Sequence, residues 1–145
     1  MKNFAILITC YNRKVETIAC LRSLFSIDMK LDVFLVDDGS TDGTKEAIAI
    51  EFPNVQIIKG TGNLFWNRGM NLAWEEASKQ AYDFYVWLND DVQVYPDFLE
   101  ELLACSTLSS YKSIISGIIE DKNTGITIYG GYDTQRKLIS VNGKM

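Results

Sequence analysis

The chain alternates apolar runs of strand length with stretches whose apolar residues recur at helical spacing, and this feature limits its fold most strongly. Residues 4–8 form the first run, and Val15, Ile18 and Leu21 follow at helical intervals. Three further pairs repeat the pattern, with strands expected at residues 33–36, 55–58 and 84–88 and helices at residues 44–52, 70–77 and 96–106. This order predicts an α/β fold in which a mostly parallel sheet is flanked by helices.

The pattern changes near residue 113, where helical spacing gives way to short apolar runs. Residues 113–119 and 126–129 are expected to be strands joined by a tight turn, and residues 138–141 to be another strand. No linker or repeat interrupts the chain, so a single domain is predicted over residues 1–145. Because no helix follows these strands, we expect a domain cut short at its C-terminal end, whose exposed edge could pair with a second copy in a homodimer.

Charge and composition remove several classes of function. A formal net charge of −5 argues against a nucleic-acid partner, since the phosphate backbone requires a face rich in lysine and arginine. The chain contains no histidine, which excludes catalysis by Ser/His/Asp or Cys/His arrangements. Polar chemistry must therefore come from carboxylates, hydroxyls, amides and basic side chains. A domain of 145 residues needs no metal to hold its core, so any metal would serve chemistry.

The cysteines and the N-terminus indicate the compartment. Cys10, Cys20 and Cys105 are far apart and form no C-x-x-C pair, so we expect no disulfide or zinc site and interpret each as a small buried side chain. The apolar run at residues 4–10 is too short for a signal peptide or a membrane span. These features predict a reducing, cytoplasmic location.

Polar loops follow each of the first four predicted strands, at residues 9–13, 37–42, 60–68 and 89–91. In open α/β sheets ligands bind outside the carboxyl ends of the strands, so we expect these loops to converge on one edge. Adjacent carboxylates after a strand suit a hard divalent cation, and Asp91, alone or with Asp90, is the predicted ligand of Mn²⁺ or Mg²⁺.

The same loops offer groups for a nucleotide. Arg68, Arg13 and Lys14, together with N–H groups of the glycine loop, could share the charge of a diphosphate. Asp37 and Asp38 could accept hydrogen bonds from a base or from ribose hydroxyls. A purely structural interpretation stays open, because residues 37–44 have the composition of a turn and helix cap and residues 89–91 that of a solvated strand end.

Aromatic residues and glycines carry less information. Among the tryptophans and tyrosines, only Trp66 and Tyr11 stand next to the loops and are candidates to touch a ligand, and the others are expected in the core. Gly60 and Gly62 lack the third glycine of a dinucleotide-binding fingerprint, where Phe65 stands instead. A dehydrogenase of the Rossmann type is therefore disfavoured.

Four segments together resemble motifs of the family 2 glycosyltransferases with the GT-A fold, in a version similar to rhamnosyltransferase-like bacterial members. They are residues 6–13, 36–44, 62–71 and 87–92, in the same order and spacing, and the resemblance covers residues 4 to about 103. It implies a Rossmann-like nucleotide-diphospho-sugar transferase fold. Asn89 stands where the family has the first acid of its D-x-D motif.

The resemblance also implies roles for individual residues. Thr9, Tyr11 and Asp38 would hold the pyrimidine and ribose, Asp90 the ribose or donor sugar, and Asp91 the metal. The full candidate set for the nucleotide is Thr9, Tyr11, Asn12, Asp37, Asp38, Arg68, Asn89 and Asp90.

The reaction implied is transfer of a sugar from a UDP- or dTDP-sugar, with inversion, to a saccharide or lipid-linked saccharide acceptor in bacterial polysaccharide or cell-surface glycan synthesis. The full-length protein could then lie at the inner face of the membrane. The family's acceptor half, which carries the base, has no counterpart before residue 145, so no catalytic residue is assigned. We expect the isolated chain to bind nucleotide and to transfer sugar poorly.

Other functions remain as alternatives. The chain could be a catalytically incomplete nucleotide-binding fragment or a non-enzymatic α/β binding module. A receiver-like module would need its acceptor aspartate after a later strand with a lysine opposite, and the predicted strand ends past Asp91 offer no such lysine. A haloacid-type phosphatase would need a nucleophilic aspartate after the first strand, and residues 9–13 contain none.

Overall fold

The computed structural model of the protein describes residues 2–108, 110–111 and 114–129. The chain divides into two compact units, Met1–Phe98 and Leu99–Met145. The single domain expected over the whole chain stays a prediction, and the two units are described separately.

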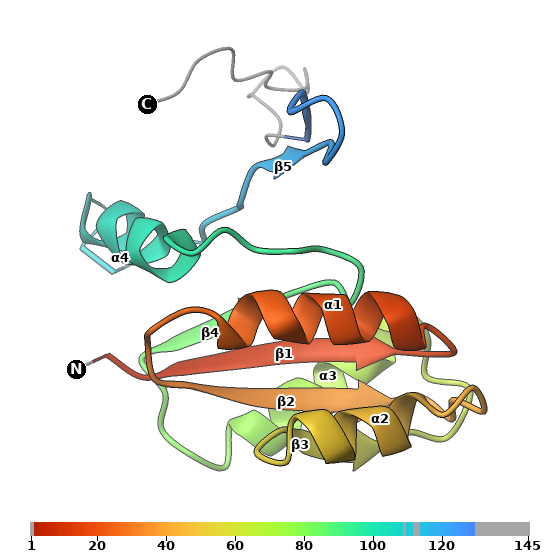
Figure 1. Ribbon diagram of the computed structural model, residues 1–145. Helices are drawn as coiled ribbons and strands as arrows, with labels where there is room; N and C mark the ends of the chain where they lie inside the picture. Colours follow the sequence, from red (N-terminus) through yellow and green to blue (C-terminus); the bar gives the residue numbers. More distant parts are fainter. Residues whose placement is uncertain (1, 109, 112–113, 130–145) are drawn as a thin grey trace. The chain divides into compact units, whose positions relative to one another are not determined.

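The first unit is built on a four-stranded sheet in the order β3-β2-β1-β4 (Figure 1). Its strands are β1 (Phe4–Cys10), β2 (Leu31–Asp37), β3 (Gln56–Lys59) and β4 (Phe84–Trp87). All neighbouring pairs are parallel, and Phe4 stands opposite both Leu31 and Phe84. This confirms the expected α/β class with a parallel sheet.

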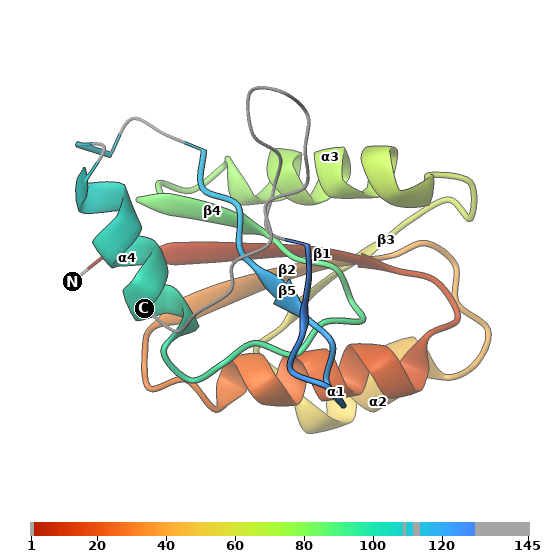
Figure 2. The same ribbon diagram turned by 90° about the horizontal axis from the view of Figure 1, so that it is seen from above.

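Helices cover both faces of this sheet (Figure 2). They are α1 (Lys14–Phe25), α2 (Thr44–Glu51) and α3 (Phe65–Ala77). Figure 2 shows α3 on one face and α1 with α2 on the other. After β3 the chain returns to the opposite side of β1, so the order of the strands reverses between β1 and β4. Such a reversal is where open α/β sheets form ligand crevices.

The core beneath α3 is tightly packed. Ala5 and Leu7 of β1 pack with Phe34 of β2 and with Met70 and Ala73 of α3, and all five are almost completely buried. Gly69 lets α3 approach β1 closely, because a Cβ atom at this position would overlap the Thr9 hydroxyl. The apolar runs therefore bury themselves as their pattern predicts, and one glycine sets how close helix and strand can come.

Two strands extend farther than their apolar runs. β1 and β2 reach Cys10 and Asp37, because these two residues still stand opposite each other in the parallel ladder. At the end of β4, Leu88 donates its N–H to the carbonyl of Leu7 at 3.0 Å. The backbone pairing thus places the polar loops at one edge, as expected.

The second unit holds all of α4 (Phe98–Leu108) except its first residue, and a small antiparallel pair, β5 (Ile119–Glu120) with β6 (Thr127–Tyr129). The turn between these strands is the expected one, since the Asp121 carboxylate accepts the N–H groups of Asn123 and Thr124. Residues 114–118 form no strand, contrary to expectation, because the pairing with β6 extends only to Ile119 and Glu120 of β5. Residue 113 and the strand predicted at 138–141 lie outside the described residues.

No helix within the described ranges combines the length and the apolar character needed to cross a membrane.

Candidate functional site

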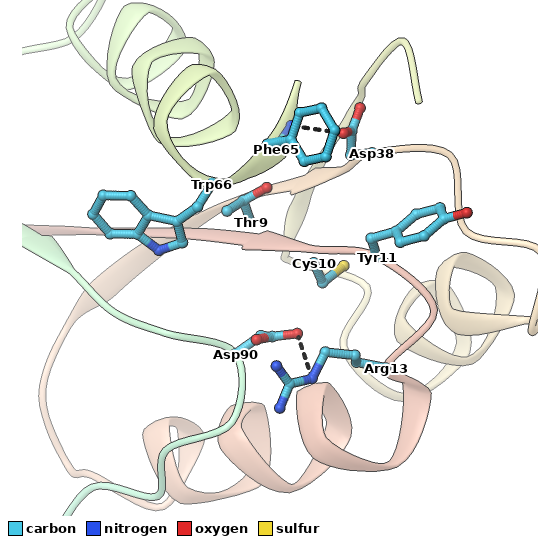
Figure 3. Close-up of a pocket in the computed structure, with 8 residues that line it drawn as sticks. All are labelled: Thr9, Cys10, Tyr11, Arg13, Asp38, Phe65, Trp66 and Asp90. Atoms are coloured by element: carbon cyan, nitrogen blue, oxygen red, sulfur yellow. Dashed lines mark hydrogen bonds and ion pairs between the residues drawn. The ribbon is translucent and has the colours of Figure 1, made fainter. Parts of the chain in front are cut away.

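A pocket of about 180 Å³ opens at the carboxyl ends of β1, β2 and β4, beside the reversal of strand order (Figure 3). Its lining combines aromatic, hydroxyl, acidic and basic side chains from four loops that are far apart in the sequence. The lining residues are Thr9, Cys10, Tyr11, Arg13, Asp38, Phe65, Trp66 and Asp90. All of them belong to the first unit.

Asp38 anchors the glycine loop that leads into α3. Its carboxylate, only 6% exposed, accepts the N–H of Gly62 at 2.7 Å, that of Leu64 at 2.8 Å and that of Phe65 at 3.1 Å. The negative charge also lies at the N-terminus of α3, where the helix dipole favours an anion. Sequence reasoning assigned this residue to the pyrimidine and ribose and missed its bonds to the backbone.

Glycines in both loops make this close packing possible. A Cβ atom at Gly60 would lie 2.6 Å from the Asp38 carboxylate and 2.7 Å from its Cα. Gly39 has a φ of +86° and packs against Gly62. A Cβ atom added to Gly39 would lie 3.2 Å from the Gly62 Cα. The glycines noted in the sequence as a cradle for phosphate are therefore needed first for the approach of one loop to another.

Asn12 holds the loops after β1 and β2 together, and Asp37 fixes the turn within the loop after β2. The Asn12 side-chain oxygen accepts the N–H of Thr41 at 2.7 Å, and the Asn12 N–H donates to the Ser40 hydroxyl at 2.9 Å. Asp37 accepts the N–H of Ser40 at 2.9 Å. The interpretation of residues 37–44 as a turn is supported by these bonds. They also explain why Asn12 adopts a φ of 51°, in the left-handed region that asparagine tolerates.

The acidic pair after β4 is joined by Arg13. The guanidinium Nε lies 3.7 Å from Asp90 Oδ2, and Nη2 donates to Asp91 Oδ2 at 2.9 Å. Asp90 is buried, and the Thr17 hydroxyl lies 3.4 Å from the same carboxylate oxygen. Burial raises the pKa of the Asp90 carboxyl, while the charge of Arg13 acts in the opposite direction. The Asp91 side chain remains 41% exposed.

Arg13, rather than Arg68, is the arginine that lines the pocket. Arg68 folds back on its own loop, where its guanidinium donates to the carbonyls of Leu64 and Asn63. Its predicted contact with a nucleotide stays a prediction. Asn89, another predicted site residue, accepts the indole N–H of Trp66 at 3.0 Å and so fixes the orientation of that ring.

Three exposed aromatic side chains line the pocket. Tyr11 and Trp66 were candidates from the sequence, but Phe65 was not, although it is 75% exposed and has a φ of 54°. A bulky side chain in that region is a strained conformation of the kind that collects at ligand sites. Its only signal in the sequence was its position just after the glycine loop.

Trp74 and Trp87 correct the expectation that the remaining tryptophans belong to the core. They are 40% and 50% exposed and pack edge to face at 6.0 Å. The cause lies in the topology, because β4 is at the edge of its sheet in the first unit and lacks a neighbouring strand on that side among the described residues.

The cysteines behave as expected at two positions of three. Cys10 and Cys20 are buried, and burial is the main reason that the pKa of each thiol is raised to about 12. Cys10 therefore stays a neutral thiol in the pocket wall and is not suited to act as a nucleophile. Cys105 is exposed, contrary to expectation, since it lies on a face of α4 that the described residues leave open.

The exposure of these thiols predicts their reactivity. In the native protein at pH 8, one thiol per chain should react rapidly with a chromogenic disulfide reagent, and three should react after unfolding in guanidinium. Replacing Cys105→Ser should remove the rapid phase. Rapid reaction of two thiols in this variant would contradict the burial of Cys10 and Cys20.

The donor groups fit a divalent cation that is shared with a substrate. The described residues contain no cluster of three or more acidic, cysteine or histidine side chains that could hold a metal alone. Mg²⁺ and Mn²⁺ are, however, often bound through one or two carboxylates together with substrate phosphates. Asp91 supplies one exposed carboxylate of this kind, beside a buried one at Asp90.

Comparisons with known proteins place this site in context. A curated relative, N-acetylglucosaminyl-diphospho-decaprenol L-rhamnosyltransferase of Mycobacterium tuberculosis, is 26% identical over 104 residues, which cover 66% of this chain and 34% of the relative. The chain thus spans about a third of the length of the curated relatives it matches.

Solved structures share the fold. S. aureus TarS 1–349 in complex with UDP-GlcNAc has a TM-score of 0.63 at 22% identity, covering 74% of this chain and 32% of TarS. The mannosyltransferase PcManGT from Pyrobaculum calidifontis, in complex with GDP-Man and Mn²⁺, has a TM-score of 0.61 at 23% identity, covering 69% of this chain and 31% of that protein. The expected GT-A fold is confirmed. Residues 5–132 match the family model described as glycosyl transferase family 2, and the chain belongs to this family.

Proposed function

We propose that the pocket binds the nucleoside diphosphate of a sugar donor and that the protein transfers the sugar to an acceptor. One observation carries this proposal: a single pocket at the strand reversal is lined by three aromatic side chains and by Arg13, whose guanidinium also contacts the carboxylates of Asp90 and Asp91. A flat base and a charged diphosphate require these two environments side by side. TarS and PcManGT, which share the fold, were crystallised with nucleotide sugars.

The donor would lie across the carboxyl ends of the strands. In this proposal the base and ribose contact Thr9, Tyr11 and Phe65, and the diphosphate lies towards Arg13 and Asp91. Asp90 is near enough to the pocket to contact the ribose or the donor sugar. The remaining candidates act through the loops. Asp37, Asp38 and Asn12 fix the backbone around the pocket, and Asn89 holds Trp66.

A divalent cation, Mn²⁺ or Mg²⁺, fits this proposal with Asp91 as its protein ligand. When bound, such an ion would stabilise the departing nucleoside diphosphate as a Lewis acid. Arg13 can add hydrogen bonds to the phosphate oxygens, because its guanidinium presents several N–H groups in a fixed plane. The neutral Cys10 thiol and the aromatic side chains of the pocket would contribute apolar surface beside the donor.

The wider reaction extends the proposal beyond the pocket. We propose a UDP- or dTDP-sugar as donor, inversion at the anomeric carbon, and a saccharide or lipid-linked saccharide as acceptor in bacterial polysaccharide synthesis. The name of the M. tuberculosis relative, which specifies a sugar linked to decaprenol through a diphosphate, supports an acceptor of this class. Action in the cytoplasm, at the inner face of the membrane, belongs to the same proposal.

The proposal is tested by isothermal titration of the full chain with UDP, dTDP and UMP, each with and without Mn²⁺. We expect UDP or dTDP to bind at least about tenfold more tightly with Mn²⁺, because the cation bridges carboxylate and phosphates. The affinity for UMP, which lacks the second phosphate, should rise much less when Mn²⁺ is added. Equal binding of UDP and UMP, or heat from neither, would contradict a donor site here.

A further inference from the structure

Arg13 makes a contact that the proposed donor site does not by itself explain. Its Nη2 donates to Asp91 Oδ2 at 2.9 Å, while its Nε faces Asp90 Oδ2 at 3.7 Å. The guanidinium therefore bridges the buried carboxylate and the exposed one. Asp91 Oδ2, the oxygen it holds, belongs to the residue that would bind a divalent cation.

The two carboxylates that contact Arg13 differ in how strongly they depend on its positive charge. Asp90 is 6% exposed, and a buried carboxylate without a counter-charge is strongly unfavourable. Asp91 is exposed and can be neutralised by solvent or by a cation. The Nε contact with Asp90 is therefore the permanent part of the bridge, and the Nη2 contact with Asp91 is the part that can be exchanged.

The backbone of Arg13 supports such an exchange. Its carbonyl accepts both the N–H of Thr17 at 2.9 Å and the Thr17 hydroxyl at 2.7 Å, which fixes the start of α1. The side chain is 43% exposed and lines the pocket, so its outer end can turn without disturbing the helix. A guanidinium and a divalent cation cannot both lie at 3 Å or less from one carboxylate oxygen without strong repulsion.

From these observations, and resting on the donor site proposed above, we infer that Arg13 is an internal counter-ion that competes with the divalent cation for Asp91 and is released from it by the diphosphate. Cation binding and nucleotide binding are then coupled through one side chain. The cation alone must displace the guanidinium, whereas the diphosphate offers the guanidinium new acceptors and leaves Asp91 to the cation. The protein consequently binds the bare cation weakly and the cation with the nucleotide well.

The test compares the full-length protein with Arg13→Gln, which keeps a hydrogen-bond donor and removes the charge. Arg22→Gln is the matched control, because Arg22 is an exposed arginine of α1 that is paired with a carboxylate, Glu51, away from this pocket. Mn²⁺ binding is measured without nucleotide from the electron paramagnetic resonance signal of free Mn²⁺, and UDP binding is measured with Mn²⁺ by calorimetry.

We expect Arg13→Gln to bind Mn²⁺ alone about five- to tenfold more tightly than the unsubstituted protein, and to bind UDP with Mn²⁺ about tenfold more weakly. Arg22→Gln should match the unsubstituted protein in both. A rise in Mn²⁺ affinity together with a fall in UDP affinity indicates that Arg13 exchanges Asp91 for the diphosphate, since general damage to the pocket would weaken both affinities. A folded Arg13→Gln with unchanged or weaker Mn²⁺ binding overturns the inference.

Arg13→Gln leaves the buried charge of Asp90 unpaired, which could prevent this variant from folding. A second pair of variants therefore tests the inference without that charge. Asp90→Asn is compared with Arg13→Gln/Asp90→Asn, which removes both members of the buried pair and keeps Asp91. If the double variant binds Mn²⁺ more tightly than Asp90→Asn does, the inference is supported, and equal Mn²⁺ affinities of the two variants overturn it. A third outcome separates this inference from the proposed donor site. If the unsubstituted protein bound no UDP but Arg13→Gln still bound Mn²⁺ more tightly than it, the donor site would be wrong and the competition for Asp91 would be supported.

Discussion

Replacing Asp38→Ala is expected to lower the free energy of unfolding by about 3 kcal/mol or more, because backbone N–H groups then lose a charged acceptor inside the protein. The affected groups belong to Gly62, Leu64 and Phe65, which together form the end of the glycine loop and the start of α3. No other carboxylate is bonded to these three N–H groups in the described structure. The effect should appear as a lower urea midpoint by circular dichroism.

Asp42→Ala is the matched control for this prediction. Asp42 also accepts backbone N–H groups, from Thr44 at 3.1 Å and from Lys14 at 3.0 Å, but it lies at the surface, where water can replace it. Its replacement should shift the midpoint clearly less than that of Asp38. Equal midpoints for the two variants would mean that the loop is held by something other than the buried carboxylate.

Two substitutions of Asp38, to asparagine and to alanine, separate a positioning role from a contact with the nucleotide. Asp38→Asn keeps one oxygen acceptor and can hold part of the loop. If Asp38 acts through the loop, UDP affinity and the urea midpoint should fall together from the unsubstituted protein to Asp38→Asn and then to Asp38→Ala. If its carboxylate contacts the base, UDP affinity should fall in Asp38→Asn without a matching fall in the midpoint.

Much of the fold could be predicted from the sequence because it follows from backbone periodicity. The runs at residues 4–8 and 33–36 are apolar without interruption, which is typical of parallel strands covered on both faces. Parallel pairing then brings the loops after β1, β2 and β4 to one edge. Of the candidate site residues, Thr9, Tyr11, Asp38 and Asp90 do line the pocket at this edge.

The directions of individual side chains could not be predicted in this way. A loop sequence does not show that Asp38 turns towards the backbone of the glycine loop, or that Arg68 folds onto its own carbonyls while Arg13 reaches the acidic pair. These choices depend on distances between loops that come together only in the folded chain. The exposure of Trp74 and Cys105 is equally non-local, because it depends on which faces the remaining elements cover.

Replacing Asp91→Ala is expected to abolish the contribution of Mn²⁺ to UDP binding, so that the affinity measured with the metal loses the factor of about ten or more that Mn²⁺ adds in the unsubstituted protein. The reason is that Asp91 is the one exposed carboxylate of the pair, and the neighbouring Asp90 is buried behind Arg13. Calorimetric titration with and without Mn²⁺ measures the change directly. Asp28→Ala, an exposed carboxylate just before the amino end of β2, should leave both affinities unchanged.

Without metal, the same substitution should act in the opposite direction. Removing Asp91 takes a negative charge away from the diphosphate and leaves Nη2 of Arg13 without this acceptor. UDP should therefore bind Asp91→Ala at least as tightly as it binds the unsubstituted protein when Mn²⁺ is absent, and the two titrations of the variant should coincide. This pattern distinguishes loss of a metal ligand from loss of the pocket, because a collapsed pocket would weaken binding under both conditions. If Mn²⁺ still strengthened UDP binding to Asp91→Ala by the original factor, the cation would have to be held elsewhere, and both its assignment to Asp91 and its competition with Arg13 would be wrong.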